Sequence, residues 1–249
     1  MAYQEVVIGT ANAGNGDTPF DAWTKTKSNI EELYGLAPVS ITGATSLTSS
    51  ALGKVHLCSG TSADYTVDLP TAVGNEGVII FKGINALTKV VTIAGSGGQT
   101  IDGESSRTIS TDGMIAVMSD GSNWVVVNEV GSWIPYTPVL AGWSADPTFA
   151  RTDFWRVGKL ITVRIINSTS GTSNATTKTI TGPFNAAEAS HGSLLVVVNN
   201  GTAQTTPGVA RTRVGSSTID LYRNNDLGST AWTSSGNCSI AMYITYRMA

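Results

Sequence analysis

The feature that most limits the fold of this chain is a succession of short β-branched and aromatic runs separated by turn residues. Between residues 54 and 130 the runs recur about every eight to twelve residues, a spacing typical of all-β domains. Glycine, asparagine and aspartate separate them, as in Asp102-Gly103 and Asp112-Gly113. The expected strands are 55–58, 65–69, 78–82, 90–93, 107–109, 114–118 and 124–127.

A second all-β block follows Trp133-Ile134-Pro135. Its last run, 238–247, alternates Ile240, Met242 and Ile244 with smaller or polar residues, which predicts a strand with one buried face. A β-sandwich of jelly-roll kind is our first choice for this block. Its expected strands are 154–157, 160–166, 178–181, 194–198, 210–214, 218–222 and 238–247.

The composition excludes several classes of function. Only 13% of the 249 residues are charged and the formal net charge is −3, so the chain has no basic field for nucleic acid. No apolar run approaches the roughly 20 residues of a membrane span, and the first residues do not resemble a secretory signal. We expect a protein made in the cytoplasm that does not insert into membranes. Cys58 and Cys238 are expected to be small apolar strand residues.

Near the N-terminus, the sequence predicts a helix over residues 19–34. Thr18 is a good N-cap, Pro19 suits the first helical position and Gly35 suits the end. Apolar residues line one side of this predicted helix and are interrupted by a single lysine. An isolated helix of this length is only marginally stable in water. We therefore expect it to pack against copies of itself or against another protein. The predicted contact residues are Phe20, Trp23, Lys27, Ile30, Leu33 and Tyr34.

These patterns divide the chain into four parts. Residues 1–35 form an attachment and self-association segment, and the charge-free, Ser/Thr/Gly-rich residues 36–53 read as an extended linker. Residues 54–131 form a small all-β module, and 132–249 form the C-terminal sandwich. We therefore expect a mainly β fold with a short N-terminal helix.

Three motifs carry a family resemblance. The first is a Gly/Asn/Asp-rich loop that leads into a short helix ending in Glu32-Leu33-Tyr34. The second combines Asp68-Leu69-Pro70-Thr71-Ala72 with Thr100-Ile101-Asp102-Gly103 and a later Ser119-Asp120-Gly121-Ser122-Asn123-Trp124. The third joins Tyr136-Thr137-Pro138-Val139-Leu140 to residues 155–163. Together they resemble the tail-fibre and receptor-binding proteins of bacteriophage virions.

The resemblance implies a homotrimer that is anchored to other virion proteins through its N-terminus. It also implies location on a tail or head appendage and host adsorption through the C-terminal domain. The chain departs from the family at Lys27, where an apolar residue is more usual. It has no long repeat array, which suggests a short fibre or a tip.

Motifs of common enzymes are missing: the sequence has no GxSxG, HExxH or GxxxxGK[ST]. We expect a protein that is not an enzyme and needs no cofactor or metal. Glycan cleavage would need two nearby carboxylates. Two pairs could meet this requirement: Asp146 with Asp153, and Asp220 with Asp226. The alternative is that these residues are exposed aspartates in turns. His56 alternates with Val55 and Leu57, so we expect it to point away from the local core.

Sugar recognition needs an aromatic face beside planar polar groups. Residues 222–226 and Trp232 offer both, and Trp143 with Asp146 is a second place. The alternative is that the tryptophans fill the core and the Asn-Asn-Asp run is a turn. The candidate glycan-binding residues are Trp143, Asp146, Tyr222, Arg223, Asn224, Asn225, Asp226 and Trp232.

The sequence therefore favours a homotrimeric phage fibre protein that binds a bacterial surface polysaccharide or protein. A structural head fibre, decoration or connector protein that binds only other virion proteins is one alternative. A polysaccharide-cleaving tip is the other.

Overall fold

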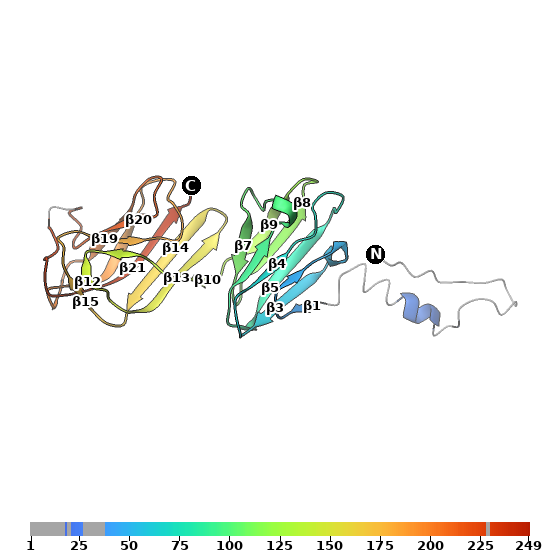
Figure 1. The fold of residues 1–249 in the computed structure, drawn as a ribbon, viewed down its shortest axis with the longest axis horizontal. Helices are drawn as coiled ribbons and strands as arrows, with labels where there is room; N and C mark the ends of the chain where they lie inside the picture. The colour runs from blue at the N-terminus through green and yellow to red at the C-terminus, as the bar shows by residue number, and fades with distance from the viewer. Residues whose placement is uncertain (1–17, 19–20, 27–37, 228–229) are drawn as a thin grey trace. The chain divides into compact units, whose positions relative to one another are not determined.

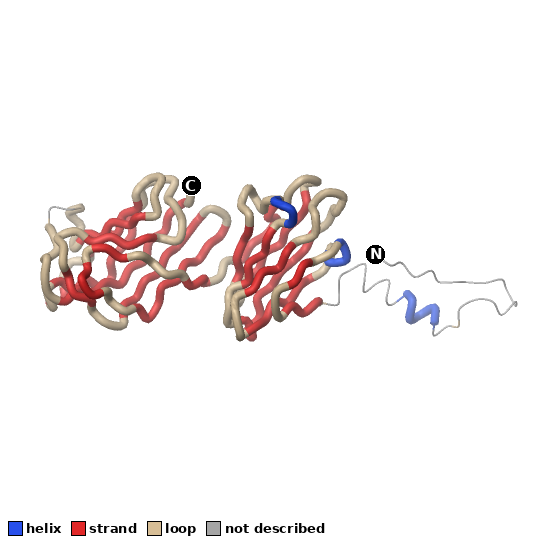
Figure 2. The backbone as a smooth tube through the Cα atoms, viewed as in Figure 1, coloured by secondary structure: helices blue, strands red, loops and turns tan. Residues whose placement is uncertain are grey.

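The structure is a computed structural model that describes residues 18, 21–26, 38–227 and 230–249. The chain divides into two compact units, Met1–Val130 and Gly131–Ala249. Strands are the main regular element of both units, so the predicted mainly β class is confirmed (Figures 1 and 2).

The N-terminal helix begins as its cap predicts. Residues 21–26 are helical, the Asp21 amide donates a hydrogen bond to Thr18 Oγ1 at 3.1 Å, and the Ala22 amide donates to the Thr18 carbonyl. Trp23 is 67% exposed. The remainder of the predicted helix, 27–34, and Phe20 lie outside the described residues.

Besides the helix at residues 21–26, the described residues of unit 1 form nine strands and two short 3₁₀ helices. The strands are β1 (Val39–Ile41), β2 (Thr45–Ser46), β3 (Val55–Gly60), β4 (Tyr65–Asp68), β5 (Val78–Leu87), β6 (Val91–Ala94), β7 (Ser106–Ile109), β8 (Met114–Ser119) and β9 (Trp124–Val130). The 3₁₀ helices are η1 (Ser49–Ala51) and η2 (Ser96–Gly98).

The first six strands of unit 1 alternate between two sheets, and β7 to β9 do not. One sheet has the order β1-β3-β5-β8-β9 and the other β2-β4-β6-β7. Strands β1, β3 and β5 run parallel, as do β2, β4 and β6, so the chain winds as a short β-solenoid. Antiparallel β7, β8 and β9 complete the two sheets.

The inner faces of these two sheets enclose one core. Its largest members include Phe81 and Trp124, both fully buried. Arg107 on β7 and Glu129 on β9 form a buried ion pair at 2.7 Å that links one sheet to the other. A guanidinium this deep is tolerated because a carboxylate neutralises it.

Residues 38–53 differ from the predicted linker. They form β1, β2 and η1, and β1 pairs in parallel with β3 while β2 pairs with β4. The linker prediction was wrong because these strands are too short and polar to give a periodic pattern. Their backbone hydrogen bonds come from partners later in the chain.

The described part of unit 2 forms twelve strands. They are β10 (Trp133–Pro135), β11 (Leu140–Ala141), β12 (Trp143–Ala145), β13 (Phe149–Val157), β14 (Leu160–Asn167), β15 (Gly171–Ser173), β16 (Lys178–Thr181), β17 (His191–Asn199), β18 (Thr202–Ala203), β19 (Gly208–Thr212), β20 (Thr218–Tyr222) and β21 (Asn237–Arg247).

All strand pairs of unit 2 are antiparallel and connect into one curled sheet (Figure 1). The main path is β10-β13-β14-β21-β17-β19-β20-β16-β11. Ile240, Met242 and Ile244 of β21 are buried while Tyr243 and Thr245 are exposed, which confirms the predicted one-sided strand. The finer jelly-roll assignment stays a prediction.

Both cysteines and one histidine face the cores. Cys58 and Cys238 are fully buried in strands, as predicted. His56 is buried and stacks on Phe81 with 5.4 Å between ring centroids, so the prediction that it points away from the core was wrong. Its alternation places it with Cys58 on the inner face of β3, while Val55 and Leu57 occupy the outer face.

Candidate ligand pocket and apolar sheet face

A pocket of about 390 Å³ lies in unit 2 where β16, β19 and β20 meet the segment 230–232. Strand pairing puts Thr179, Asp220 and Arg211 side by side, because Asp220 is the partner of both other residues. The complete lining is Thr176, Thr177, Lys178, Thr179, Arg211, Arg213, Asp220, Leu221, Tyr222, Thr230, Ala231 and Trp232.

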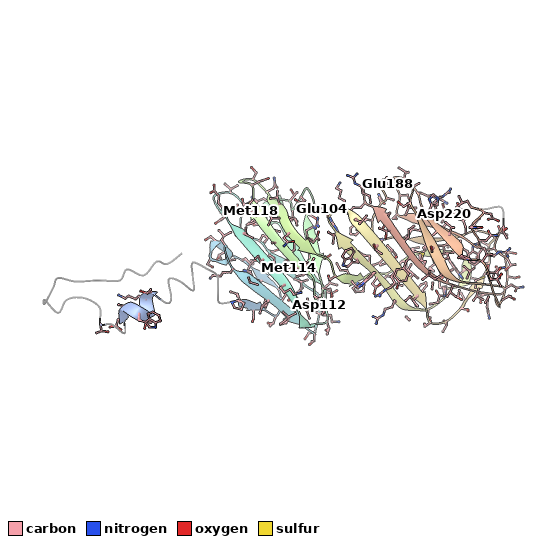
Figure 3. The ribbon with its side chains drawn as sticks, turned by 180° about the vertical axis from the view of Figure 1, so that it is seen from behind. Glu104, Asp112, Met114, Met118, Glu188 and Asp220 are labelled. Atoms are coloured by element: carbon pink, nitrogen blue, oxygen red, sulfur yellow. The ribbon has the colours of Figure 1, made fainter. Side chains whose placement is uncertain are left out.

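Two arginines share one carboxylate in this pocket. Arg213 contacts Asp220 with both Nε (3.0 Å to Oδ2) and Nη2 (2.5 Å to Oδ1), and these bonds raise the pKa of Arg213. Arg211 makes a single long hydrogen bond to Asp220, from Nη2 to Oδ2 at 3.4 Å. The guanidinium carbon of Arg211 lies 5.2 Å from the centroid of the Tyr222 ring. Asp220, labelled in Figure 3, is buried, whereas Arg211 is partly exposed and Arg213 is exposed.

Lys178 occupies the interior beneath the pocket. Its ammonium lies 4.5 Å from the Trp143 ring centroid and 5.6 Å from that of Trp232, and it donates to the Gly142 carbonyl and to Ser173 Oγ. Burial lowers the pKa of Lys178. Cation–π contacts and these two hydrogen bonds replace the water that the ammonium loses.

The two tryptophans proposed as sugar platforms are core residues. Trp143 is 7% exposed and Trp232 is 3% exposed, and the Trp232 indole donates to the Leu221 carbonyl at 2.8 Å. Both rings enclose Lys178, so the prediction that they present a flat face to a sugar was wrong. The alternative reading, in which these tryptophans fill the core, is confirmed.

The other predicted residues are spread over several places. Tyr222 lines the pocket, whereas Arg223, Asn224, Asn225 and Asp226 follow it in the next turn and do not. Asp226 accepts a hydrogen bond from the Thr230 hydroxyl. Asp146 is exposed and lies after β12.

Sequence reasoning missed Arg211 and Arg213 as site residues. The sequence did contain a signal for this site. Arg211 and Arg213 occupy alternate positions, and Asp220 lies on the next predicted strand.

In each carboxylate pair considered for glycan cleavage, one member is engaged by arginine. Arg164 binds Asp153 through two hydrogen bonds of 2.8 and 2.6 Å, and Asp220 is held by Arg211 and Arg213. Within the described residues, no three His, Cys, Asp or Glu side chains gather closely enough to hold a metal ion.

Unit 1 has a hollow of about 630 Å³ between its turns. Turn residues surround it, and its one charged side chain is Asp68, which accepts a hydrogen bond from Ser46 at 3.0 Å. Its lining holds no aromatic or cationic side chain. This hollow offers less for recognising a sugar than the pocket of unit 2.

The outer face of the sheet β1-β3-β5-β8-β9 is mostly apolar. Cross-strand partners share a face, so the register identifies its members. They are Ser40, Val55, Leu57, Val78, Ile80, Lys82, Met114, Ala116, Met118, Val125, Asn128 and Val130. Met118 is 39% exposed and Val130 49% exposed; Met114 and Met118 are labelled in Figure 3. We call this set the apolar sheet face.

The second sheet of unit 1 presents the opposite chemistry. Its outward positions, identified in the same way, are Ser46, Thr66, Asp68, Thr92, Ala94, Ser106 and Thr108. The outer face of the second sheet is therefore suited to contact with water, whereas the apolar sheet face is suited to burial against another surface.

No protein-family model matches the chain, and no curated protein matches it. Among the described residues, no helix has the length and apolarity to cross a membrane.

Proposed function

We propose that the chain is a bacteriophage fibre protein that self-associates as a homotrimer and binds a host surface glycan. In this proposal residues 1–35 attach it to other virion proteins, and residues 132–249 make contact with the host cell. The proposal keeps the function implied by the sequence resemblance and adds a surface for self-association.

The observation that carries the proposal is the apolar sheet face. An apolar surface that spans several strands is unfavourable in water, and such patches mark interaction sites. The polar outer face of the second sheet shows that this is no general property of the unit's surface. A second and third copy of the same sheet would cover the face with matching chemistry, as closed homo-oligomers do.

The described start of the N-terminal helix agrees with this arrangement. Trp23 is exposed, so the chain's described residues leave this large aromatic side chain open for a partner. In a trimer, three such helices would cover one another's apolar seams.

Self-association also gives a physical reason for binding cells. Three weak glycan sites on one particle raise the avidity by about 10²–10⁴ without any new contact. A monomer with the same pocket would dissociate quickly from a bacterial surface.

An adsorption experiment tests this function with a matched pair of variants. Ile80→Glu places a charge in the middle of the apolar sheet face, and Thr92→Glu places the same charge on the polar face of the other sheet. We expect the labelled full-length chain and Thr92→Glu to be retained on cells from a panel of encapsulated bacteria. We expect Ile80→Glu to bind at least 100-fold more weakly.

Competition and location complete the test. Purified surface polysaccharide should block retention of the wild-type chain. Retention on purified virions with no binding to any cell panel would contradict receptor binding and favour the purely structural alternative. Release of reducing ends from the polysaccharide would favour the cleaving alternative.

A further inference from the structure

We infer that the unit 2 pocket binds a saccharide that carries a carboxylate, such as a hexuronic acid, with Arg211 as the main contact for the acid group. This inference deepens the proposed function, since it rests on glycan binding by unit 2 and names the class of sugar.

The size of the pocket fits a carbohydrate. Its volume of about 390 Å³ lies at the lower end of the roughly 300–1,000 Å³ of small-molecule sites. Such a volume accommodates one or two pyranose rings rather than an extended polymer. A sugar unit at the end of a polysaccharide, or on one of its side branches, would enter the pocket.

The charge of the pocket points to an acidic group. Two guanidinium groups face one carboxylate, and the carboxylate is committed mainly to Arg213, which it contacts in a two-pronged arrangement. Arg211 makes one long contact of 3.4 Å, so most of its five N–H donors have no partner among the described residues. A ligand carboxylate would complete the charge balance and give Arg211 the planar partner that its geometry favours.

Tyr222 prepares Arg211 for this role. The guanidinium carbon lies 5.2 Å from the centroid of the Tyr222 ring, and the side chain of Arg211 is 37% exposed. The ring therefore restricts the guanidinium while leaving it within reach of solvent and ligand. Holding the group in place before binding reduces the entropy lost on binding.

The rest of the lining suits the hydroxyl groups of the sugar. Four threonines, Thr176, Thr177, Thr179 and Thr230, contribute hydroxyls that donate and accept, and Asp220 can accept from a sugar hydroxyl. Tyr222, Leu221 and Ala231 contribute apolar surface for the C–H groups of the ring.

Calorimetric titration of the full-length chain tests the inference. The probes are trigalacturonic acid and the same trisaccharide with its carboxyl groups reduced to alcohols. We expect the acidic probe to bind at least tenfold more tightly, with an affinity that falls as salt is raised. Arg211→Gln should weaken binding of the acidic probe at least tenfold, while the exposed Arg151→Gln, on β13 of the same unit, should leave it unchanged.

Arg211→Lys serves as a second variant, with circular dichroism confirming that each variant is folded. It keeps the charge but loses the planar fork, so we expect an intermediate loss. Equal binding of both probes, no binding of the acidic probe at millimolar concentration, or full binding by Arg211→Gln would each overturn the inference. Adsorption to cells that a neutral polysaccharide blocks would overturn this inference and leave the proposed function standing.

Discussion

His56 shows how burial of one ring couples stability to pH. The imidazole is 2% exposed and stacked on Phe81, and burial lowers its pKa from the ordinary value of 6.5. The unfolded chain therefore binds a proton more readily than the folded chain. The stabilising contribution of the neutral ring is present above about pH 6.5 and is lost as the pH falls below it.

We predict that His56→Phe makes unit 1 less sensitive to acid. Between pH 7.5 and pH 5 the wild-type chain should lose more thermal stability than the variant, because phenylalanine has no proton to gain. Melting curves followed by circular dichroism at both pH values measure the difference. Equal losses in the two chains would show that His56 does not contribute.

The buried pair Arg107 and Glu129 makes a second prediction at the residue scale. Arg107→Met leaves the Glu129 carboxylate buried without its closest partner, which should destabilise unit 1 by about 3–5 kcal/mol. Replacing both residues, as in Arg107→Met with Glu129→Leu, should recover most of that loss. Urea unfolding of the two variants provides the comparison; a double variant no more stable than the single one would argue against this account.

Among elements, the strands with strong local patterns were predictable. Each of the expected strands overlaps an observed one, and 178–181 and 218–222 match β16 and β20 residue for residue. Alternating apolar residues and Asp-Gly or Gly-rich turns carry this information locally.

The short strands β1 and β2 and the solenoid path were not predictable in this way. Parallel partners such as β1 and β3 are separated along the chain by a strand of the other sheet, so no local pattern reveals their pairing. The unit 2 pocket was not predicted either, because its residues meet only through strand pairing and not through a local sequence pattern. Arg211 and Asp220 meet through the register of β19 and β20, whereas Tyr222 was recognised from its own local sequence.

Close packing between β17 and β21 gives a prediction at the element scale. A Cβ at Gly192 would lie 2.4 Å from the Tyr243 carbonyl oxygen and 2.6 Å from Ile244 Cβ. Gly192→Ala should therefore push the two strands apart and destabilise unit 2 by about 1–3 kcal/mol. The neighbouring exposed Ser193→Ala is the control, and it should change the unfolding free energy by less than about 0.5 kcal/mol. Chemical unfolding of both variants tests the prediction; a harmless Gly192→Ala would contradict this packing.

At the scale of the whole molecule, the apolar sheet face is the feature on which the proposed function rests. The solenoid leaves one outer face polar and one apolar, and a chain that functions alone gains nothing from the apolar one. Self-association through this face would bury it and place several copies of unit 2 on one particle. Under the proposed function, several copies of the pocket would then contact the same bacterial surface.

The mass of the full-length chain in solution tests self-association most directly. Sedimentation equilibrium over a concentration series should give three times the chain mass of 25.9 kDa for the wild type and for Thr92→Glu. Ile80→Glu should give the mass of a single chain. A wild-type protein that stays at the mass of one chain at micromolar concentration would contradict the account.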